Sequence, residues 1–143
     1  MFSSKNVYIS DYSVSKNLSQ SKHSEQLLIF DYYPVTMKPL VSVIVIAHDR
    51  KKFLPFALNS LKSQDVDKRL FEVILVKNYD DIEIDNIARK EGFHCVRTDL
   101  KTASEKLLLG YRISVGNIVS FLEDDDLYSP SKINRLIDIS NSK

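Results

Sequence analysis

Apolar residues along the chain fall into two patterns, which alternate. Residues 41–47 (Val-Ser-Val-Ile-Val-Ile-Ala) and 71–77 (Phe-Glu-Val-Ile-Leu-Val-Lys) are short, β-branched runs, the pattern of strands buried on both faces of a sheet. Two shorter runs, at 94–98 and 117–122, predict further strands. The segments that follow these runs predict helices, from helical spacing of apolar residues or from capping signals. The sequence therefore predicts four strands, each followed by a helix.

Capping residues set the limits of the expected helices. The first is expected over residues 52–64, where Pro55 is tolerated because it falls in the first turn. Thr102 and Glu105 have the spacing of a capping box, in which each side chain bonds the other residue's backbone N–H. The other expected limits are Asp80 with Glu83 as a capping box, Gly92 and Gly116 as helix ends, and Ser129-Pro130 before the last helix.

This order predicts a doubly wound α/β fold, with a mostly parallel sheet and helices on both faces. Ligands of such sheets bind beyond the carboxyl ends of the strands, where the strand order reverses. That rule selects candidate positions before any motif is considered. They are His48 and Asp49, Lys77 and Asn78, Asp99, and Glu123 to Asp126.

The acidic run Glu123 to Asp126 follows a predicted buried strand. Adjacent carboxylates repel one another at neutral pH and favour proton uptake or a bound cation. Oxygen ligands suit hard divalent ions, which indicates Mg²⁺ or Mn²⁺. A solvated acidic loop that helps to cap the following helix is the other interpretation.

Composition narrows the class of protein. A length of 143 residues suits one domain, and a net charge of +1 gives no field that would attract nucleic acid. The single cysteine, Cys95, excludes an intramolecular disulfide. The longest apolar stretch is too short to span a bilayer, and no secretory signal is visible. We therefore expect a cytoplasmic protein.

The first 36 residues differ from the rest, because they hold eight of the chain's 18 serines and no sustained period of 3.6 or 2. We expect a mostly flexible leader over residues 1–36 and one folded domain over residues 37–143. Met37 stands directly before the first strong strand. Two interpretations stay open: translation starting at Met37, so that the assigned start is wrong, or a mobile N-terminal arm.

Three segments in the right order resemble the family 2 glycosyltransferases of the GT-A fold. Residues 41–50 are similar to the opening strand V-S-V-I-I-P-T-Y-N-R, and residues 72–78 to E-I-I-V-V-D-D. Residues 110–126 are similar to G-I-x-x-A-x-G-E-x-I-x-F-L-D-x-D-D. Together the matches cover about residues 40 to 135. The resemblance implies a truncated GT-A, Rossmann-like domain that binds a nucleotide-sugar donor.

The resemblance also implies roles for residues at the strand ends. The nucleotide would face Ala47, His48 and Asp49. Asn78 stands where the family has an Asp that bonds the base, and Asp124 would lie near the ribose. Asp125 would hold the metal on the donor diphosphate. Asp126 would either assist in binding the metal or hold a metal ligand in place. A UDP-sugar is the expected donor, and other bases stay open because Asn78 offers both a donor and an acceptor.

Members of this family usually continue into an acceptor-binding half with an Asp or Glu as general base. We therefore expect that base beyond residue 143, and the acceptor is unknown. A half-domain with an uncovered apolar face would self-associate, so a homo-oligomer is expected, and peripheral membrane contact is open. The expected function is metal-dependent glycosyl transfer to a hydroxyl. The alternative is a catalytically incomplete nucleotide-binding module, or a subunit that needs a partner chain.

Two other classes with related architecture fit less well. A receiver-type signalling domain has its acidic pair after the first strand, whereas the acidic run here follows the fourth predicted strand. A nucleotidyltransferase wants a glycine-rich loop after the first strand, and residues 48–52 contain no glycine.

Overall fold

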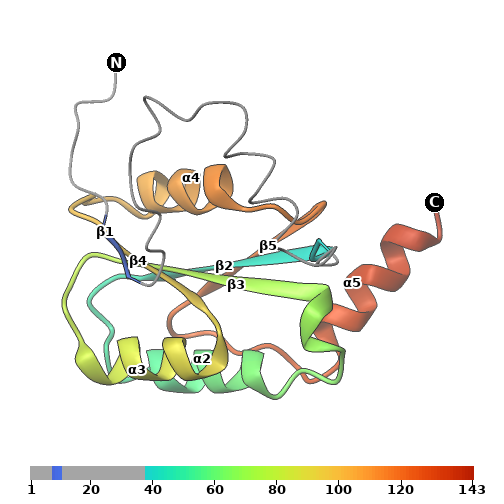
Figure 1. Ribbon diagram of the computed structural model, residues 1–143, viewed down its shortest axis with the longest axis horizontal. Coiled ribbons are helices and arrows are strands. Elements are labelled where there is room, and N and C mark those ends of the chain that lie inside the picture. The colour runs from blue at the N-terminus through green and yellow to red at the C-terminus, as the bar shows by residue number, and fades with distance from the viewer. Residues whose placement is uncertain (1–7, 11–37) are drawn as a thin grey trace, which may run out of the picture.

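The computed structural model describes residues 8–10 and 38–143. These residues form one five-stranded sheet in the order β1-β4-β3-β2-β5, with helices on both faces (Figure 1). β2 to β5 are parallel, and β1 pairs antiparallel with β4 at one edge. The predicted doubly wound, mostly parallel α/β fold is confirmed. The strands are β1 Tyr8–Ser10, β2 Val41–Ala47, β3 Phe71–Lys77, β4 His94–Arg97 and β5 Ile118–Glu123.

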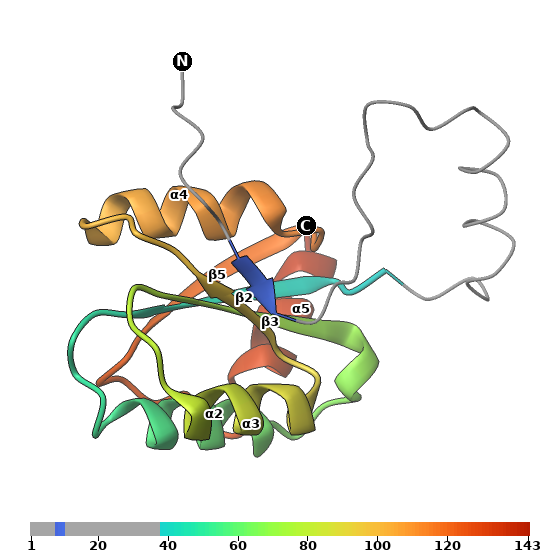
Figure 2. The same cartoon turned by 60° about the vertical axis from the view of Figure 1, so that its left-hand side comes forward.

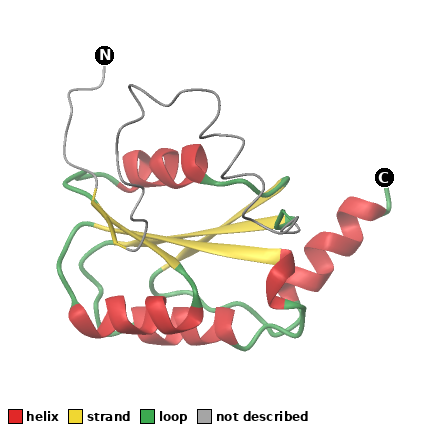
Figure 3. Cartoon of the chain, viewed as in Figure 1, coloured by secondary structure: helices red, strands yellow, loops and turns green. Residues whose placement is uncertain are grey.

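The helices divide unequally between the two faces of the sheet. α4 covers one face, and α2 and α3 lie side by side on the other (Figures 1 and 2). α5 adds two buried isoleucines to the core on the α2 side. Figure 3 shows the strand layer between the two helix layers. The helices are α2 Leu54–Lys62, α3 Ile82–Glu91, α4 Ala103–Ile113 and α5 Lys132–Asn141, with a 3-10 turn, η1, at Lys68–Leu70.

Alternation along β2 explains why this strand organises the core. All seven residues of β2 are buried. Val41, Val43 and Val45 join the cluster under α2, α3 and α5, whereas Ile44 and Ile46 join a smaller cluster under α4. Successive side chains of a strand point to opposite faces. A strand between two helix layers is therefore apolar at nearly every position, which is the pattern that predicted it, and the exception, Ser42, is buried with hydrogen bonds to Glu72 and the Gly116 N–H.

Most element limits agree with the sequence, and the differences lie at caps. Thr102 and Glu105 form the expected capping box of α4, and Gly92 ends α3 with a φ of 73°. The expected capping box at Asp80 is wrong, because Asp81 is the N-cap and its side chain accepts from the Ile84 N–H.

Two further helix limits were wrong. α4 ends at Ile113, three residues before Gly116, and the N-cap of α5 is Ser131 rather than Ser129. The N–H of Lys132 bonds the Ser129 carbonyl, so the chain makes a turn before the helix begins.

The strand order places the reversal point between β2 and β5. From β2 the chain builds outward through β3 to β4, and then returns to pair β5 with the other side of β2. β2 and β5 are in register from Val41 with Ile118 to Ile46 with Glu123. The segments after Ala47 and after Glu123 therefore leave the sheet side by side, at the edge where such folds bind ligands.

The expected leader lies outside the described residues except for β1, which the sequence did not predict. None of the helices in the described ranges, 8–10 and 38–143, has the length and apolarity to cross a bilayer. Cellular location and self-association stay predictions.

A variant that begins at Met37 is expected to keep its thermal midpoint within a few degrees of the full chain's. Within residues 38–143, both buried clusters are built from residues between Val41 and Ile137, and the described part of the leader, β1, forms a three-residue edge pairing. Calorimetry of both proteins checks this. A midpoint lowered by more than several degrees would mean that residues 1–36 support the core.

Candidate functional site

The site is built where β2 and β5 end. Asp124, the first residue after β5, is fully buried. Its Oδ2 accepts a hydrogen bond from the His48 N–H, directly after β2, at 2.8 Å. One buried carboxylate therefore joins the two strand ends across the reversal point of the sheet.

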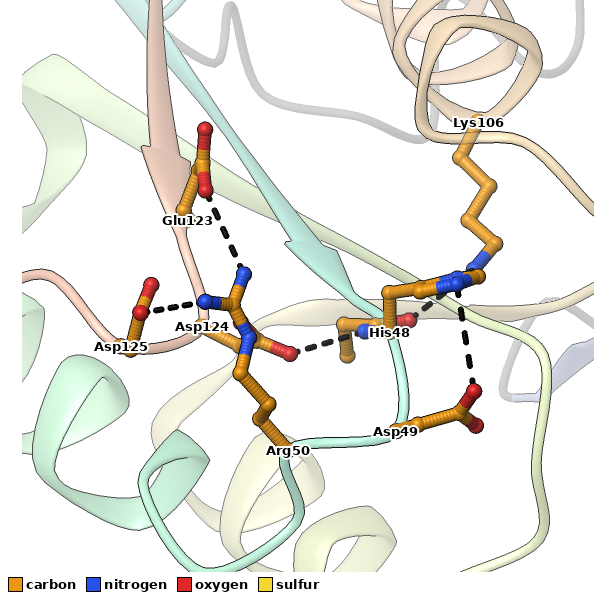
Figure 4. A network of polar contacts seen from close by, with 8 residues as sticks. His48, Asp49, Arg50, Lys106, Glu123, Asp124 and Asp125 are labelled. Carbon is orange, nitrogen blue, oxygen red and sulfur yellow. Dashed lines mark hydrogen bonds and ion pairs between the residues drawn. The ribbon is translucent and has the colours of Figure 1, made fainter.

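Arg50 gathers the acidic run around a single guanidinium (Figure 4). Its Nε lies 2.9 Å from Asp124 Oδ1, and its Nη2 lies 3.3 Å from Glu123 Oε2. Its Nη1 contacts Asp125 Oδ2. Desolvation opposes the charge of Arg50, but the charges of Asp124, Asp125 and Glu123 outweigh it and raise the pKa of Arg50. From the sequence, a bound metal ion was expected to offset the repulsion among these carboxylates. In the structure, the guanidinium of Arg50 offsets it.

The backbone between Ala47 and Arg50 is held from the α4 side. Lys106 is fully buried, and its Nζ donates to the Ala47 carbonyl at 3.2 Å and contacts His48 Nδ1 at 2.8 Å. The other ring nitrogen of His48 lies 3.8 Å from Asp49 Oδ2. Asp49 has a φ of 63°, a left-handed conformation that aspartate tolerates better than most residues. A buried cation thus fixes the loop that sequence reasoning placed against the nucleotide.

Burial lowers the pKa of Lys106, which gives a pH-dependent prediction. The unfolded chain holds this proton up to about the usual value of 10.5, whereas the folded chain releases it at lower pH. Between these two pKa values the unfolded state binds more protons, so the contribution of Lys106 to the free energy of unfolding rises with pH. Lys106→Met should lack this contribution. Urea unfolding of both proteins from pH 7 to 10 measures the difference, and parallel pH profiles would contradict the prediction.

Three buried polar atoms near these strand ends have no hydrogen-bond partner among the described residues: Asn78 Oδ1, Tyr79 Oη and Asp124 Oδ1. Asp124 Oδ1 lies close to Arg50, but the contact is an ion pair without hydrogen-bond alignment. Burial, with the charges of Asp124, Asp81 and Asp49, raises the pKa of Tyr79 to about 12. Unpartnered buried polar atoms are rare and need an explanation. Three at one edge indicate a surface shaped for a polar ligand.

The structure therefore brings together most of the positions expected from the sequence. Ala47, His48, Asp49, Asp124 and Asp125 lie in one contact network (Figure 4). Two expected residues lie outside it, Asn78 at the end of the neighbouring β3 and the exposed Asp126.

Sequence reasoning missed Arg50, Lys106 and Tyr79 as parts of this edge. A signal existed for Arg50, because it is a cation three residues beyond β2, which pairs with the strand that the acidic run follows. Lys106 left no such signal in the sequence, and only the structure shows that it is buried on α4 together with Gly110 four residues on.

A divalent cation fits this donor set as a weak site that a ligand would complete. In the described part of the chain, no three His, Cys, Asp or Glu residues are placed to hold a metal ion together. Asp125 is one-third exposed, and the neighbouring Asp124 keeps a buried oxygen without an aligned hydrogen bond. Mg²⁺ and related ions are often bound by one or two carboxylates together with substrate phosphates and water. The residues present fit that arrangement.

Cavities occur at both ends of the sheet. One of about 250 Å³ lies beside the site, lined by His48, Arg50, Thr102 and Glu123 among others. A larger one, of about 440 Å³, lies at the opposite end and is lined by residues that include Glu72 and His94. Size alone would select the second cavity, but the buried carboxylate and the unpartnered atoms lie at the first edge.

Comparison with known proteins gives the family. The model of "Glycosyl transferase family 2" matches residues 42–141. This chain belongs to glycosyl transferase family 2. The match runs from the first buried strand through the acidic run to the last helix, so it covers the segments that carried the resemblance except for Val41. The predicted family is confirmed.

Individual relatives agree with the family. An uncharacterized glycosyltransferase of Haemophilus influenzae (strain Rd) is 30% identical over 105 residues, which are 70% of this chain and 34% of the relative. The chain thus spans about a third of that relative's length.

Solved structures show the same fold. S. aureus TarS 1-349 in complex with UDP-GlcNAc matches with a TM-score of 0.65 and 21% identity, over 71% of this chain and 31% of that one. A mannosyltransferase from Pyrobaculum calidifontis in complex with GDP-Man and Mn²⁺ matches with a TM-score of 0.56 and 19% identity, over 75% and 35%. At these identities the likeness establishes the GT-A fold.

Proposed function

We propose that this chain forms the donor-binding part of a glycosyltransferase and holds a nucleoside-diphosphate sugar, a UDP-sugar first of all, at the ends of β2, β3 and β5. The observation that carries the proposal is the set of three buried polar atoms at that edge that make no hydrogen bond within the described residues, one of which, Asp124 Oδ1, has only its ion pair with Arg50. The family and the nucleotide sugars held by TarS and by the P. calidifontis enzyme support it.

Each part of the donor has a matching element. The Asn78 side chain offers an acceptor oxygen, which suits the ring N–H of uracil or of guanine. Asp124, which accepts from the His48 N–H directly after β2, suits a ribose hydroxyl. The loop Ala47 to Asp49, held by Lys106, faces the rest of the nucleotide.

The metal in this proposal is Mg²⁺ or Mn²⁺, held by Asp125 with Asp126 assisting and with oxygens of the donor diphosphate. When bound, it would stabilise the negative charge of the departing nucleoside diphosphate. The chain's own residues bind and orient the donor. Transfer to an acceptor hydroxyl also needs a general base, which we assign to no residue of this chain, and the acceptor is unassigned.

The test is calorimetric titration of UDP with and without Mn²⁺. We expect Mn²⁺ to raise the affinity for UDP by about tenfold, because the metal and the diphosphate share ligands and their coupling is reciprocal. Asp125→Asn keeps the size of the side chain, removes its charge and should abolish the coupling.

The control is Asp67→Asn, which removes a carboxylate paired with an arginine, Arg69, away from the strand ends that form the site. It should leave the coupling intact. UDP affinity that ignores Mn²⁺ in the unmutated chain would contradict metal-assisted donor binding. Tight, metal-coupled binding without sugar transfer would select the binding-module alternative.

A further inference from the structure

We propose that Arg50 is the internal counterion of the acidic cluster formed by Glu123, Asp124 and Asp125, and that a divalent cation binds there by displacing its guanidinium. This inference rests on the proposed donor site, because the proposed function requires a divalent cation there. The inference adds that Arg50 sets the affinity of the site for that cation.

The first step is the geometry. The three nitrogens of one guanidinium contact three different carboxylates: Nη2 with Glu123, Nε with Asp124 and Nη1 with Asp125 (Figure 4). The planar, forked guanidinium suits such multiple contacts better than a lysine ammonium. The cation comes from the loop after β2 and the anions from the end of β5, so the contacts also tie the two loops together.

The second step is competition for the same oxygens. A metal held by Asp125 would coordinate a carboxylate that Arg50 already contacts through Oδ2. Arginine stays protonated under all ordinary conditions, and its acidic partners raise its pKa further. Two cations at one small cluster repel each other. Binding of a divalent ion and the full set of Arg50 contacts therefore oppose each other.

The third step is which group moves. The Asp124 side chain is fully buried and is fixed by the His48 N–H. The Arg50 side chain is 44% exposed and can leave the cluster without opening the core. Once displaced, its fork is available for phosphate oxygens. Arg50 thus weakens metal binding in the absence of a donor and becomes a positioning residue when the donor arrives.

A matched arginine lies elsewhere in the chain. Arg97 contacts Asp80 at 3.1 Å and Asp99 at 3.0 Å. Both of these carboxylates are well exposed, and neither belongs to the acidic cluster. Arg97→Gln removes a comparable set of ion pairs and so controls for the loss of one positive charge.

The experiment measures Mn²⁺ binding to the nucleotide-free chain by electron paramagnetic resonance. Arg50→Gln should bind Mn²⁺ about tenfold more tightly than the unmutated chain, since the loss of several half-exposed ion pairs frees the carboxylates. Arg97→Gln should leave the affinity unchanged. Unchanged or weaker Mn²⁺ binding by Arg50→Gln would overturn the proposal, and so would an equal gain in both variants.

A second measurement uses the unmutated chain, so that it does not depend on how the variant folds. The Nε–H resonance of Arg50 should shift on saturation with Mg²⁺, and an unmoved resonance would overturn displacement. Because UDP is absent from both measurements, they are separate from the donor test. A chain whose Arg50→Gln variant gains Mn²⁺ affinity but which binds no UDP would support the role of Arg50 and contradict the proposed function.

Discussion

Gly116→Ala is expected to lower the free energy of unfolding by about 3 kcal/mol, the range of severe overpacking. A Cβ at this position would lie 2.6 Å from both N and Oγ of Ser42 and 2.8 Å from the Val41 carbonyl carbon. Two of these three atoms belong to the backbone of β2, which is paired on both sides and cannot move aside. The Gly116 N–H also donates to Ser42 Oγ at 2.8 Å, so any shift would break a hydrogen bond as well.

Urea unfolding of the variant measures this loss, with Gly92→Ala as the control. Gly92 has a φ of 73°, but a Cβ there would meet nothing within 4 Å. Its replacement should therefore cost only the left-handed conformation, about 1 kcal/mol. Equal losses in the two variants would show that the approach of Gly116 to β2 is looser than the structure has it.

Asp124→Asn is expected to reduce the affinity for UDP by about a hundredfold, the equivalent of losing a buried charge-assisted hydrogen bond. Asp124 is fully buried. Its carboxylate accepts a hydrogen bond from the His48 N–H and forms an ion pair with the Arg50 guanidinium. An amide keeps the shape but loses the charge, and its NH2 group would face one of two donors. The loop after β2 and the acidic cluster would then lose their common partner.

Calorimetry with UDP and Mn²⁺ measures the effect, and Glu72→Gln is the control. Glu72 is also a largely buried carboxylate that accepts a backbone hydrogen bond, from the Val115 N–H, but at the opposite end of the sheet. Both variants should unfold more easily, and only Asp124→Asn should lose UDP. If both variants keep their affinity, Asp124 is structural and the donor site lies elsewhere.

The fold could be predicted because its signals are local. β3 has the limits expected from the sequence, residues 71–77, because a strand covered on both faces carries a mostly apolar, β-branched run that is visible locally. β1 could not be predicted, because Tyr8–Ser10 is only an edge strand and depends on its register with β4. The expected cap at Asp80 failed because Asp80 and Asp81 are equally good capping residues, and only the path of the chain decides between them.

The glycines of the family motif show what a motif match can mean. Gly110 lets α4 lie close to β2, where a Cβ would come 2.5 Å from an Ile44 methyl carbon. Gly116 allows the next close approach, to Ser42. Both positions helped to identify the family, yet their role is packing of α4 and β5 against β2. The glycines of the motif therefore indicated the fold, and only the acidic residues at its end indicated a binding site.

The candidate site was predictable only as far as strand order determines it. His48 and Asp124 follow the neighbouring parallel strands β2 and β5. The rule that ligands bind at the carboxyl ends of such strands therefore selected both residues. Lys106 was not foreseen, because a lysine in a helix is ordinarily read as solvent-exposed, whereas here its Nζ reaches the Ala47 carbonyl. The unpartnered Tyr79 hydroxyl depends on packing around it and leaves no pattern in the sequence.

The central claim is that the nucleotide sugar binds where β2, β3 and β5 end. The most direct test is a ¹H–¹⁵N spectrum of the chain titrated with UDP-GlcNAc and Mg²⁺. The account predicts shifts of backbone signals in three segments, Ala47 to Arg50, Asn78 to Tyr79 and Glu123 to Asp126. Signals around Glu72 and His94, beside the larger cavity at the opposite end, should stay in place. Shifts confined to that second region, or no shifts at millimolar ligand, would contradict the account.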